Sequence, residues 1–243
     1  MAVEAELKLS LPESERAHAK QVLETLAGGE GHAVRLSNVY FDTPALALKG
    51  ARSALRVRLS GDRWLQTFKS GGGAQAGLHR RHEWEIPVGG DALETDALIA
   101  AIERDLAATN TATDSGAASA SNSTAAAKSH AERDGLHTAL ETLRNAVPAL
   151  GPLFRTDFTR TIWNIEEAGS EIEAGLDEGD VIVGEGEQRR TLPILEIELE
   201  LKRGDEAALH RIAARLAEQI PGLKADDVSK AERGYRLRDT VTR

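Results

Sequence analysis

The sequence contains no cysteine, which excludes disulfide bonds and thiolate metal sites. It has no run of about eighteen apolar residues, and its N-terminus lacks the apolar region of a signal peptide. The 30 basic residues are outnumbered by 39 acidic ones, and the net charge of -9 argues against a nucleic-acid-binding surface. We therefore expect a cytoplasmic protein without membrane or nucleic-acid partners.

A phosphate-binding loop of the P-loop type is also absent. The glycine-rich stretch 71–77 lacks the G-x-x-x-x-G-K-[ST] spacing, so we expect a flexible loop there with no role in nucleotide binding. The seven histidines are scattered without the spacing of metal ligands, and we expect no catalytic role for His79, although it lies near a candidate strand. Lys202 and Arg203 are interpreted as solvated turn charges.

The N-terminal segment 3–9 alternates apolar and charged residues. Glu4, Glu6 and Lys8 share one parity, a period of two that is typical of a strand with one charged face. A helix start, with Glu4 and Lys8 paired four residues apart, is the alternative. Pro12 and the alternating leucines favour the strand. By itself, so short a motif fits a solvent-facing surface as well as a functional site.

Similar alternation recurs along the chain. We expect about eight strands connected in ways that suit antiparallel pairing, and four amphipathic helices. The further strands are expected at 35–41, 54–60, 64–69, 79–88, 154–165, 171–176, 181–184 and 192–202, and the helices at 14–26, 91–106, 134–146 and 206–219. A turn is expected at 177–180, between two of the strands.

The length of 243 residues suits one large domain or two small ones. Residues 90–148 read as a helical insertion in a β scaffold. Within it, the tract 107–129 consists mostly of Ala, Ser, Thr and Asn, and we expect it to be disordered or a loose loop because it has little to bury.

Most of the expected strands carry one apolar face and one face rich in Glu, Lys or Arg. For any single strand, a charged face in solvent is the ordinary arrangement. The four helices, however, need apolar sheet to cover, which leaves the charged faces on the far side of the sheet. Closed on itself, such a sheet forms a polar tunnel; left open, it forms a charged concave surface.

An interior with charges of both signs needs a ligand that satisfies both. The basic residues suit the oxygens of a polyphosphate, and the carboxylates suit a hard divalent cation that bridges phosphate to protein. The basic set is Lys8, Arg56, Arg58, Lys69, Arg81, Arg160 and Lys230, and the acidic set is Glu4, Glu6, Glu83, Glu85, Glu173, Glu196, Glu198 and Glu200.

These segments, in this order, resemble the CYTH superfamily, the triphosphate tunnel metalloenzymes. The resemblance covers nearly the whole chain apart from 107–129. It is carried by Glu4-x-Glu6-x-Lys8, by Leu55-Arg56-Val57-Arg58 after Tyr40-Phe41-Asp42-Thr43-Pro44, by Lys69, by Arg81-x-Glu83-x-Glu85, by Glu196-x-Glu198-x-Glu200, and by Ser229-Lys230-Ala231-x-Arg233-Gly234-Tyr235.

Within the superfamily, the chain is most similar to bacterial inorganic triphosphatases whose CYTH domain precedes a helical CHAD domain. Gly77-Leu78-His79, Pro152-Leu153-Phe154, Thr156-Asp157-Phe158, Leu176-Asp177 and Gly184-Glu185 carry this closer likeness. It implies a CHAD domain as a partner in the full-length chain. No CHAD region follows Arg243, so we expect either a truncated or a stand-alone form.

The resemblance implies an α+β fold, in which an eight-stranded antiparallel β-barrel with a charged interior is covered by amphipathic helices. Residues 1–243 would form a single CYTH domain. It also implies hydrolysis of inorganic triphosphate, or of a short polyphosphate, to pyrophosphate and phosphate with Mg²⁺ or Mn²⁺.

Roles for individual residues follow from the same resemblance. The phosphate-binding residues would be Lys8, Arg56, Arg58, Lys69, Arg81, Arg160 and Lys230. The metal ligands would be Glu4, Glu6, Asp177, Glu196, Glu198 and Glu200, with Asp177 equally well explained by a turn. The residues with a catalytic role would be Glu4, Glu6, Lys8, Arg58, Glu198 and Glu200.

Other activities stay open at this point. The same tunnel suits a thiamine triphosphatase, an ATPase or a class IV adenylate cyclase, although the sequence shows no pocket for a base or a thiazole ring. A non-catalytic polyphosphate-binding module is a further alternative. The complete acidic set argues against it, because a polyanion binder gains nothing from added carboxylates.

Overall fold

The computed structural model describes residues 2–114 and 123–241. The strands are β1 (Ala2–Ser10), β2 (His32–Asp42), β3 (Ala54–Ser60), β4 (Arg63–Gln75), β5 (Leu78–Pro87), β6 (Gly151–Glu167), β7 (Ser170–Val183), β8 (Arg190–Arg203) and β9 (Lys224–Ala225). The helices are α1 (Arg16–Ala27), α2 (Ala47–Gly50), α3 (Thr95–Asp114), α4 (Ser123–Ala146), α5 (Ala207–Gln219) and α6 (Lys230–Val241), with short 3-10 turns at Glu13–Glu15, Val147–Ala149 and Gly186–Gln188.

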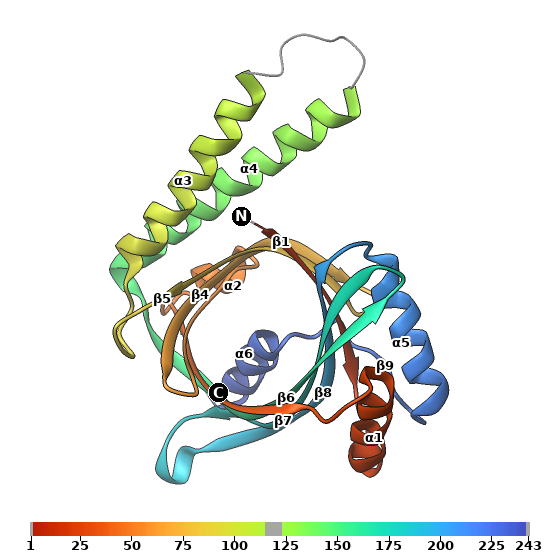
Figure 1. Cartoon of the computed structure of the whole chain (residues 1–243). Coiled ribbons are helices and arrows are strands. Elements are labelled where there is room, and N and C mark those ends of the chain that lie inside the picture. Colours follow the sequence, from red (N-terminus) through yellow and green to blue (C-terminus); the bar gives the residue numbers. More distant parts are fainter. Residues whose placement is uncertain (1, 115–122, 242–243) are drawn as a thin grey trace.

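Eight antiparallel strands close into a barrel (Figure 1). The strand order is β5-β4-β3-β2-β6-β7-β8-β1-β9, and a further pairing of β1 with β5 closes the ring. The short β9 pairs with the outer end of β1, at Leu9 and Ser10. This confirms the predicted α+β fold with an eight-stranded antiparallel barrel.

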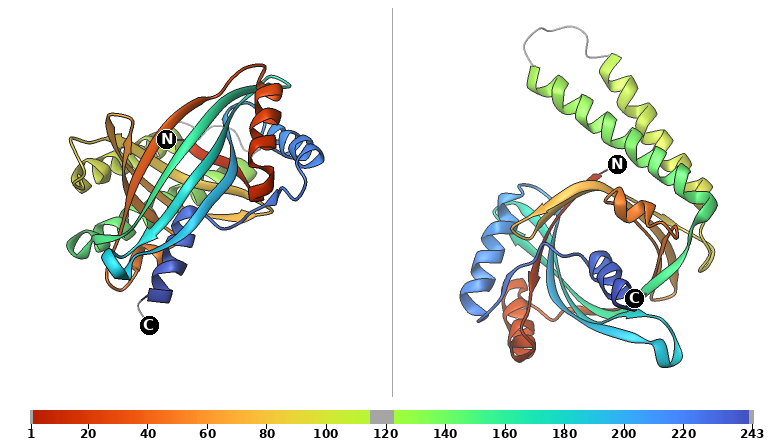
Figure 2. Two further views of the ribbon diagram at one scale, coloured as in Figure 1. Left: turned by 90° about the horizontal axis from the view of Figure 1, so that it is seen from below. Right: turned by 180° about the vertical axis from the view of Figure 1, so that it is seen from behind.

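Helices α1 and α5 cover one side of the barrel from outside (Figures 1 and 2). Their buried side chains, such as Leu23 and Ile212, pack with Leu7, Leu199 and Trp163 of the strands in one apolar cluster. Because side chains alternate along a strand, burial of these residues under the helices turns their charged neighbours into the barrel. The expected division into an apolar outer face and a charged inner face is confirmed.

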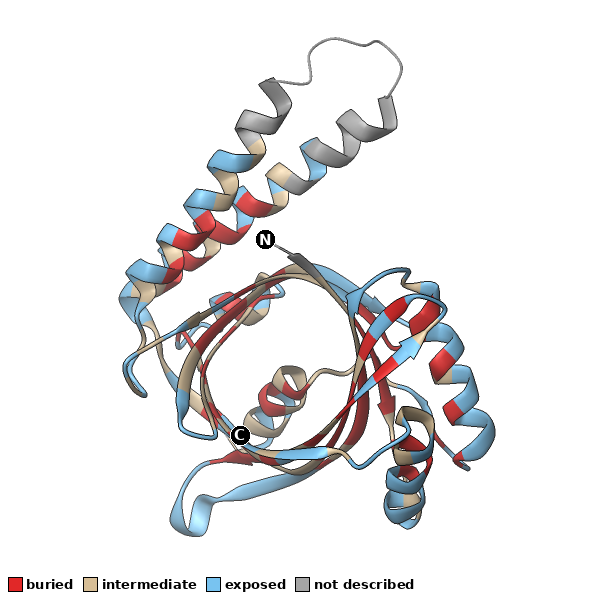
Figure 3. Cartoon of the chain, in the orientation of Figure 1, coloured by how far each residue is buried: buried red, intermediate tan, exposed pale blue. Residues whose placement is uncertain are grey.

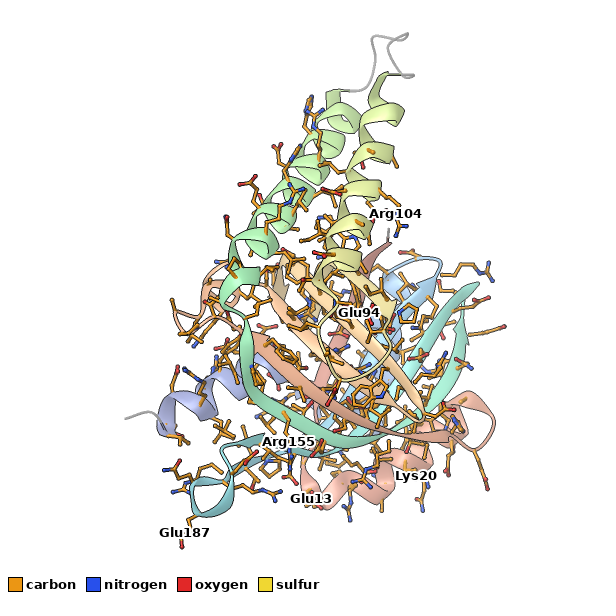
Figure 4. All side chains as sticks on the ribbon, turned by 90° about the vertical axis from the view of Figure 1, so that its left-hand side faces the viewer. Glu13, Lys20, Glu94, Arg104, Arg155 and Glu187 are labelled. Atoms are coloured by element: carbon orange, nitrogen blue, oxygen red, sulfur yellow. The ribbon has the colours of Figure 1, made fainter. Side chains whose placement is uncertain are left out.

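Helices α3 and α4 form a hairpin that projects from the β4 and β5 side of the barrel, with Arg104 marking α3 in Figure 4. Near the barrel, Leu98, Ile102 and Leu143 are fully buried and pack with Phe68 and Trp84. Where it is described, the tract 107–129 differs from the expected loop: α3 continues to Asp114 and α4 begins at Ser123. Alanine has the highest helix propensity, which accounts for the difference. Residues 115–122 lie outside the described residues.

Helix α6 lies across one end of the barrel, inside the outline of the ring in Figure 1, and no helix was expected there. Tyr235 is buried with its ring edge against Phe154, and its hydroxyl donates to Asp42 Oδ2 at 2.8 Å. A Cβ at Gly234 would collide with the Phe154 ring. The helix therefore approaches β6 closely, and Figure 3 shows buried residues where it meets the strands.

Two segments expected as turn or loop are strands. β7 runs without a break through 177–180, because a Cβ at Gly179 would collide with the Asp157 carbonyl oxygen and glycine allows β6 and β7 to stay paired. β4 continues through the glycine-rich stretch to Gln75, with a bulge between Ser70 and Gly73. The expectations of a turn at 177–180 and a loop over 71–75 are therefore wrong.

None of the helices in the described ranges, 2–114 and 123–241, combines the length and the apolar character needed to span a membrane.

Candidate functional site

The barrel encloses a cavity of about 390 Å³. Every residue of the predicted site lines it except Asp177 and Glu196. The side chains come from β1, β3, β4, β5, β6, β8 and the first turn of α6, so the site is assembled from segments far apart in the sequence. The residues that sequence reasoning placed there are Glu4, Glu6, Lys8, Arg56, Arg58, Lys69, Arg81, Arg160, Glu198, Glu200 and Lys230. We call this cavity the tunnel.

Strand β1 brings the first three of these residues next to charges on its neighbours. In the ladder with β8, Glu6 lies opposite Glu200 and Lys8 opposite Glu198. In the ladder with β5, Glu4 lies opposite Arg81. Residues opposite one another on adjacent strands project from the same face, so the period-two pattern of β1 places all of them in the tunnel.

Short ion pairs connect the tunnel residues. Lys69 Nζ lies 2.6 Å from Glu4 Oε1, and Lys8 Nζ lies 2.7 Å from Glu6 Oε1. Arg81 Nη2 donates to Glu6 Oε1 at 3.0 Å. Because Glu4 and Glu6 are each paired with cations, this wall carries mixed charge and these side chains are held in place.

Asp177 and Glu196 lie behind this wall and are completely buried. Asp177 accepts two hydrogen bonds from Arg160, at 2.7 and 2.6 Å, and its Oδ2 lies 2.5 Å from Lys230 Nζ. Glu196 pairs with Lys230 and, at 2.5 Å, with Arg233. Both carboxylates therefore fix cations whose side chains reach the tunnel or its base.

Several arginines of the tunnel have donor atoms without a carboxylate partner. Arg58 donates from Nε to the Asn38 amide oxygen at 2.7 Å, a neutral acceptor. Burial, and after it the charges of Arg56 and Arg160, lower the pKa of Arg58 to about 10. Within the described residues, the buried Nε atoms of Arg56 and Arg81 have no hydrogen-bond partner. Unpaired donors among mutually repelling guanidinium groups fit an anion as the ligand.

The carboxylates have different proton affinities. Burial raises the pKa of Glu4 to about 7, although Lys69 acts against this. Burial and Glu198 would raise the pKa of Glu6, but Lys8, Lys69 and Arg81 outweigh them and lower it. The pKa of Glu198 lies well below its usual range, because Lys230, Lys8 and Arg160 outweigh the effect of burial. Glu6 and Glu198 are therefore anionic at neutral pH.

The donor set fits a hard divalent cation. Glu6, Glu198 and Glu200 line the same cavity on adjacent strands, and carboxylate oxygens are the preferred ligands of Mg²⁺ and Mn²⁺. Oxygens of Asp177, Glu196 and Glu198 also lie within 4.8 Å of one another. In that second cluster Asp177 and Glu196 do not line the cavity, so Glu6, Glu198 and Glu200 are the donors that face a cation in the tunnel.

Several tunnel residues were not among the predicted site residues. Glu83, Glu85 and Glu173 belong to the acidic set expected in the interior, and Tyr40, Thr67, Lys202 and Ser229 were missed. The interpretation of Lys202 as a turn charge is wrong: its ammonium lies 2.8 Å from Glu200 and 3.6 Å from Glu173. Its parity with Glu198 and Glu200 on one strand was the signal that would have placed it in the tunnel.

His79 is buried on β5, opposite Glu6 of β1, but it does not line the tunnel. One ring nitrogen, Nε2, lies 3.3 Å from the Asp226 carbonyl oxygen. Burial, and after it the nearby cations Lys8 and Arg81, lower the pKa of the imidazole. His79 is thus a neutral packing residue at neutral pH.

Comparison with known proteins gives a consistent result. Residues 2–235 match the family described as CYTH domain. The chain is 30% identical over 237 residues to an inorganic triphosphatase from Haemophilus influenzae (strain ATCC 51907 / DSM 11121 / KW20 / Rd), a match that covers 98% of this chain. The chain spans about half of that relative, 55% of its length.

Solved structures with the same architecture include HpAC1 from Hippeastrum, a candidate adenylyl cyclase with a dominant triphosphatase activity. It is 21% identical, with a TM-score of 0.53 and coverage of 96% of this chain and 95% of that one. A candidate adenylate cyclase from Bacillus halodurans is 20% identical, with a TM-score of 0.51 and coverage of 96% and 98%. At these identities, the likeness shows the fold alone.

Proposed function

The chain belongs to the CYTH family, and from that premise we propose that it hydrolyses inorganic triphosphate to pyrophosphate and phosphate inside the barrel. The observation that carries the proposal is one cavity in which eight Lys and Arg side chains surround the same space as Glu4, Glu6, Glu198 and Glu200. A linear triphosphate carries several negative charges, which suits those cations of the cavity that lack a carboxylate partner, and its size suits a cavity of about 390 Å³.

The basic residues would bind the phosphate oxygens. Arg56 has an unpaired buried Nε donor and Arg58 has only a neutral acceptor, so these two arginines have the most to gain from an anion. The Nε of Arg81 is also unpaired, although its Nη2 donates to Glu6. Lys8, Lys69, Arg160 and Lys230 already have carboxylate partners, which hold them in position along the tunnel. Such preorganised charges stabilise the negative charge that moves to the leaving pyrophosphate as the bridging P–O bond breaks.

Glu6, Glu198 and Glu200, together with Glu4, would hold a Mg²⁺ or Mn²⁺ ion, which when bound would neutralise phosphate charge and lower the pKa of a bound water. Asp177 and Glu196 stay predicted metal ligands. In this proposal, their first role is to hold Arg160 and Lys230 where those cations face the substrate, while Glu196 also pairs with Arg233 behind the wall.

A water molecule held against the carboxylate side of the tunnel would attack the terminal phosphorus in line with the bridging oxygen. One P–O bond forms and one breaks, and the proton of the water leaves on the phosphate product or to solvent. Confinement between charged walls supplies the orientation that this attack needs.

Phosphate release by the purified protein tests the proposal. Tripolyphosphate, ATP, thiamine triphosphate and long-chain polyphosphate would be offered in turn, with Mg²⁺, Mn²⁺ or EDTA. We expect fast, metal-dependent release from tripolyphosphate. Preference for an organic triphosphate would favour a thiamine triphosphatase or adenylate cyclase activity instead. Tight binding without turnover would indicate a polyphosphate-binding module. A CHAD partner domain and a cytoplasmic location stay predictions.

A further inference from the structure

A second cavity, of about 340 Å³, adjoins the tunnel. The two share Ala54, Lys69, Arg81, Ser229 and Ala231 as lining residues, so they meet at a common wall. Beyond that wall, the second cavity lies between α2, the bulge of β4 and the start of α6. We call it the side compartment.

Cations dominate the side chains of the side compartment. Lys49, Arg52 and Arg236 line it together with the two shared cations, against only Asp227 and Glu232. Asp227 is engaged by the backbone, since its Oδ1 accepts from Gly77 N at 2.6 Å, and Glu232 accepts from Arg236 at 2.9 Å. Arg236 is paired in the same contact, and Lys69 and Arg81 pair with tunnel carboxylates, so the positive charge left for an anion lies mainly on Arg52 and Lys49.

Arg52 stands out among these cations. Within 2–114 and 123–241, it has no ion-pair or hydrogen-bonded side-chain partner, although Lys49 pairs with Asp239 at 3.1 Å. Its φ of 53° is in the left-handed region, at a position just after α2 where glycine is favoured. An arginine at this position has backbone strain that glycine would remove. In exchange, its side chain places an unpaired guanidinium in the side compartment.

The shared wall suits the passage of an anion. Ser229 and Ala231, from the start of the twelve-residue helix α6, line both cavities. The N-terminus of a helix carries a partial positive charge, which adds to that of Lys69 and Arg81 on the same wall. Among the described lining residues, the one aromatic ring besides His79 is Tyr235, which already packs against Phe154 and lies under Lys49. A nucleoside base therefore has little to stack on.

We propose that the side compartment binds the phosphates of a linear polyphosphate that extend beyond the three in the tunnel. Lys49 and Arg52 then make the protein prefer chains of four or more phosphates in binding. This inference rests on the proposed function for its orientation, with the first three phosphates in the tunnel.

Calorimetric titration with linear tetraphosphate and with tripolyphosphate tests it, in EDTA so that neither is hydrolysed. The variant is Lys49→Met/Arg52→Gly, which removes both cations and gives position 52 the residue its backbone favours. Since a charge-assisted hydrogen bond is worth about tenfold in affinity, we expect at least about a tenfold loss for tetraphosphate. Tripolyphosphate affinity should stay within about twofold of the wild type, as for a surface change.

The matched control is Lys20→Met/Arg189→Ala, which removes the same charge from exposed positions that line neither cavity. It should leave both affinities unchanged. This separates a local contact from a general loss of positive potential.

Equal losses for the two phosphates, no loss for either, or no binding of either by the wild type would overturn the side-compartment assignment. The assignment would also be overturned if the Lys49→Met/Arg52→Gly variant changed the affinity for ATP in parallel with that for tetraphosphate, because the occupant would then be a nucleoside. Tripolyphosphate turnover with Mg²⁺ is measured separately. Its absence would overturn the proposed function, while a selective loss of tetraphosphate affinity would still support the compartment.

Discussion

Arg58 is exposed to the charges of two other tunnel arginines, Arg56 and Arg160, and donates a hydrogen bond to the amide oxygen of Asn38. Burial and the charges of Arg56 and Arg160 make its protonated form less favourable than in water, which lowers its pKa to about 10. At neutral pH it is still charged, so the repulsion remains until an anion enters. A triphosphate would relieve this repulsion, and more so as negative charge builds up in the transition state.

For Arg58→Ala we therefore expect kcat for tripolyphosphate to fall by about 100-fold or more, the usual effect of removing a preorganised charge. Arg155→Ala is the matched control, since Arg155 is an exposed arginine on the outer face of β6 (Figure 4). Steady-state kinetics and circular dichroism give the comparison. Near-normal turnover in a folded Arg58→Ala protein would refute the role of this residue.

His79 should make stability depend on pH. Its pKa is lowered in the folded protein, so the unfolded chain takes up the proton at a higher pH than the folded one. The wild type should therefore lose stability as pH falls from about 7.5 to 5. His79→Gln should lose less over the same range. Urea unfolding at both pH values measures this, and an identical pH dependence in the two proteins would contradict it.

Among the elements, α6 both contributes a side chain to the tunnel and packs against strand β6 of the barrel. It carries Lys230 into the site and packs Tyr235 against Phe154, while Asp42 accepts from Tyr235 and from the backbone amides of Thr43, Leu48 and Lys49. The position of the cation thus depends on how closely the helix approaches β6.

Gly234→Ala should disturb this approach, because the added Cβ would collide with the Phe154 ring. Overpacking of this kind costs about 1–3 kcal/mol in the free energy of unfolding, more than the helix propensity gained from alanine. The control is Gly50→Ala, where nothing lies within 4 Å of the new Cβ. Chemical denaturation compares the two. Unchanged stability of Gly234→Ala would show that the helix is not packed as described.

The α3–α4 hairpin is an element that we propose to be separable from the site. The buried residues that are described lie near the barrel, and none of the described residues of α3 and α4 lines the tunnel. Replacement of residues 110–129 by a short Gly/Ser linker should keep kcat within about twofold, as for changes far from the chemistry. By contrast, Ile102→Ala should cost about 2–5 kcal/mol of stability, because Ile102 is fully buried. A large loss of turnover in the shortened protein would contradict separability.

At the scale of the whole molecule, the barrel could be predicted because charge and apolarity alternate along single strands. The pattern of Glu4, Glu6 and Lys8 decides which side chains face inward, and it needs no knowledge of distant contacts. The alternation could not show that the turn predicted at 177–180 is instead part of the continuous strand β7. The Asp177 side chain is taken up by Arg160 and Lys230 from other elements, and Gly179 allows a close strand contact rather than a turn.

The sequence pattern also could not predict helix α6, or which of the inward-facing carboxylates line the cavity and which lie behind its wall. The first turn of α6 carries Lys230. The burial of this turn depends on β6, β7 and β8, which lie far from it in the sequence. The sequence pattern likewise places Glu196 and Glu198 on one face, but only the packed structure puts Glu196 behind the wall and Glu198 on it.

The tunnel arginines that lack carboxylate partners also link anion binding to the free energy of unfolding of the whole domain. An anion that binds the folded barrel and not the unfolded chain stabilises it by about 2.7 kcal/mol at 100 times its Kd. For a domain of this size, tripolyphosphate should then raise Tm by about 5–10 °C. Arg58→Ala should show a smaller rise in thermal melts, and an equal rise in both proteins would place the bound anion elsewhere.

In the function proposed above, one tunnel holds both the triphosphate and a divalent cation. A crystal structure with Mn²⁺ and tripolyphosphate, with anomalous diffraction used to locate the metal, tests it most directly. We expect an anomalous peak beside Glu6, Glu198 and Glu200, with phosphate density between that peak and Arg56 and Arg58. Metal or phosphate density confined to the outer surface, with the tunnel containing neither, would contradict it.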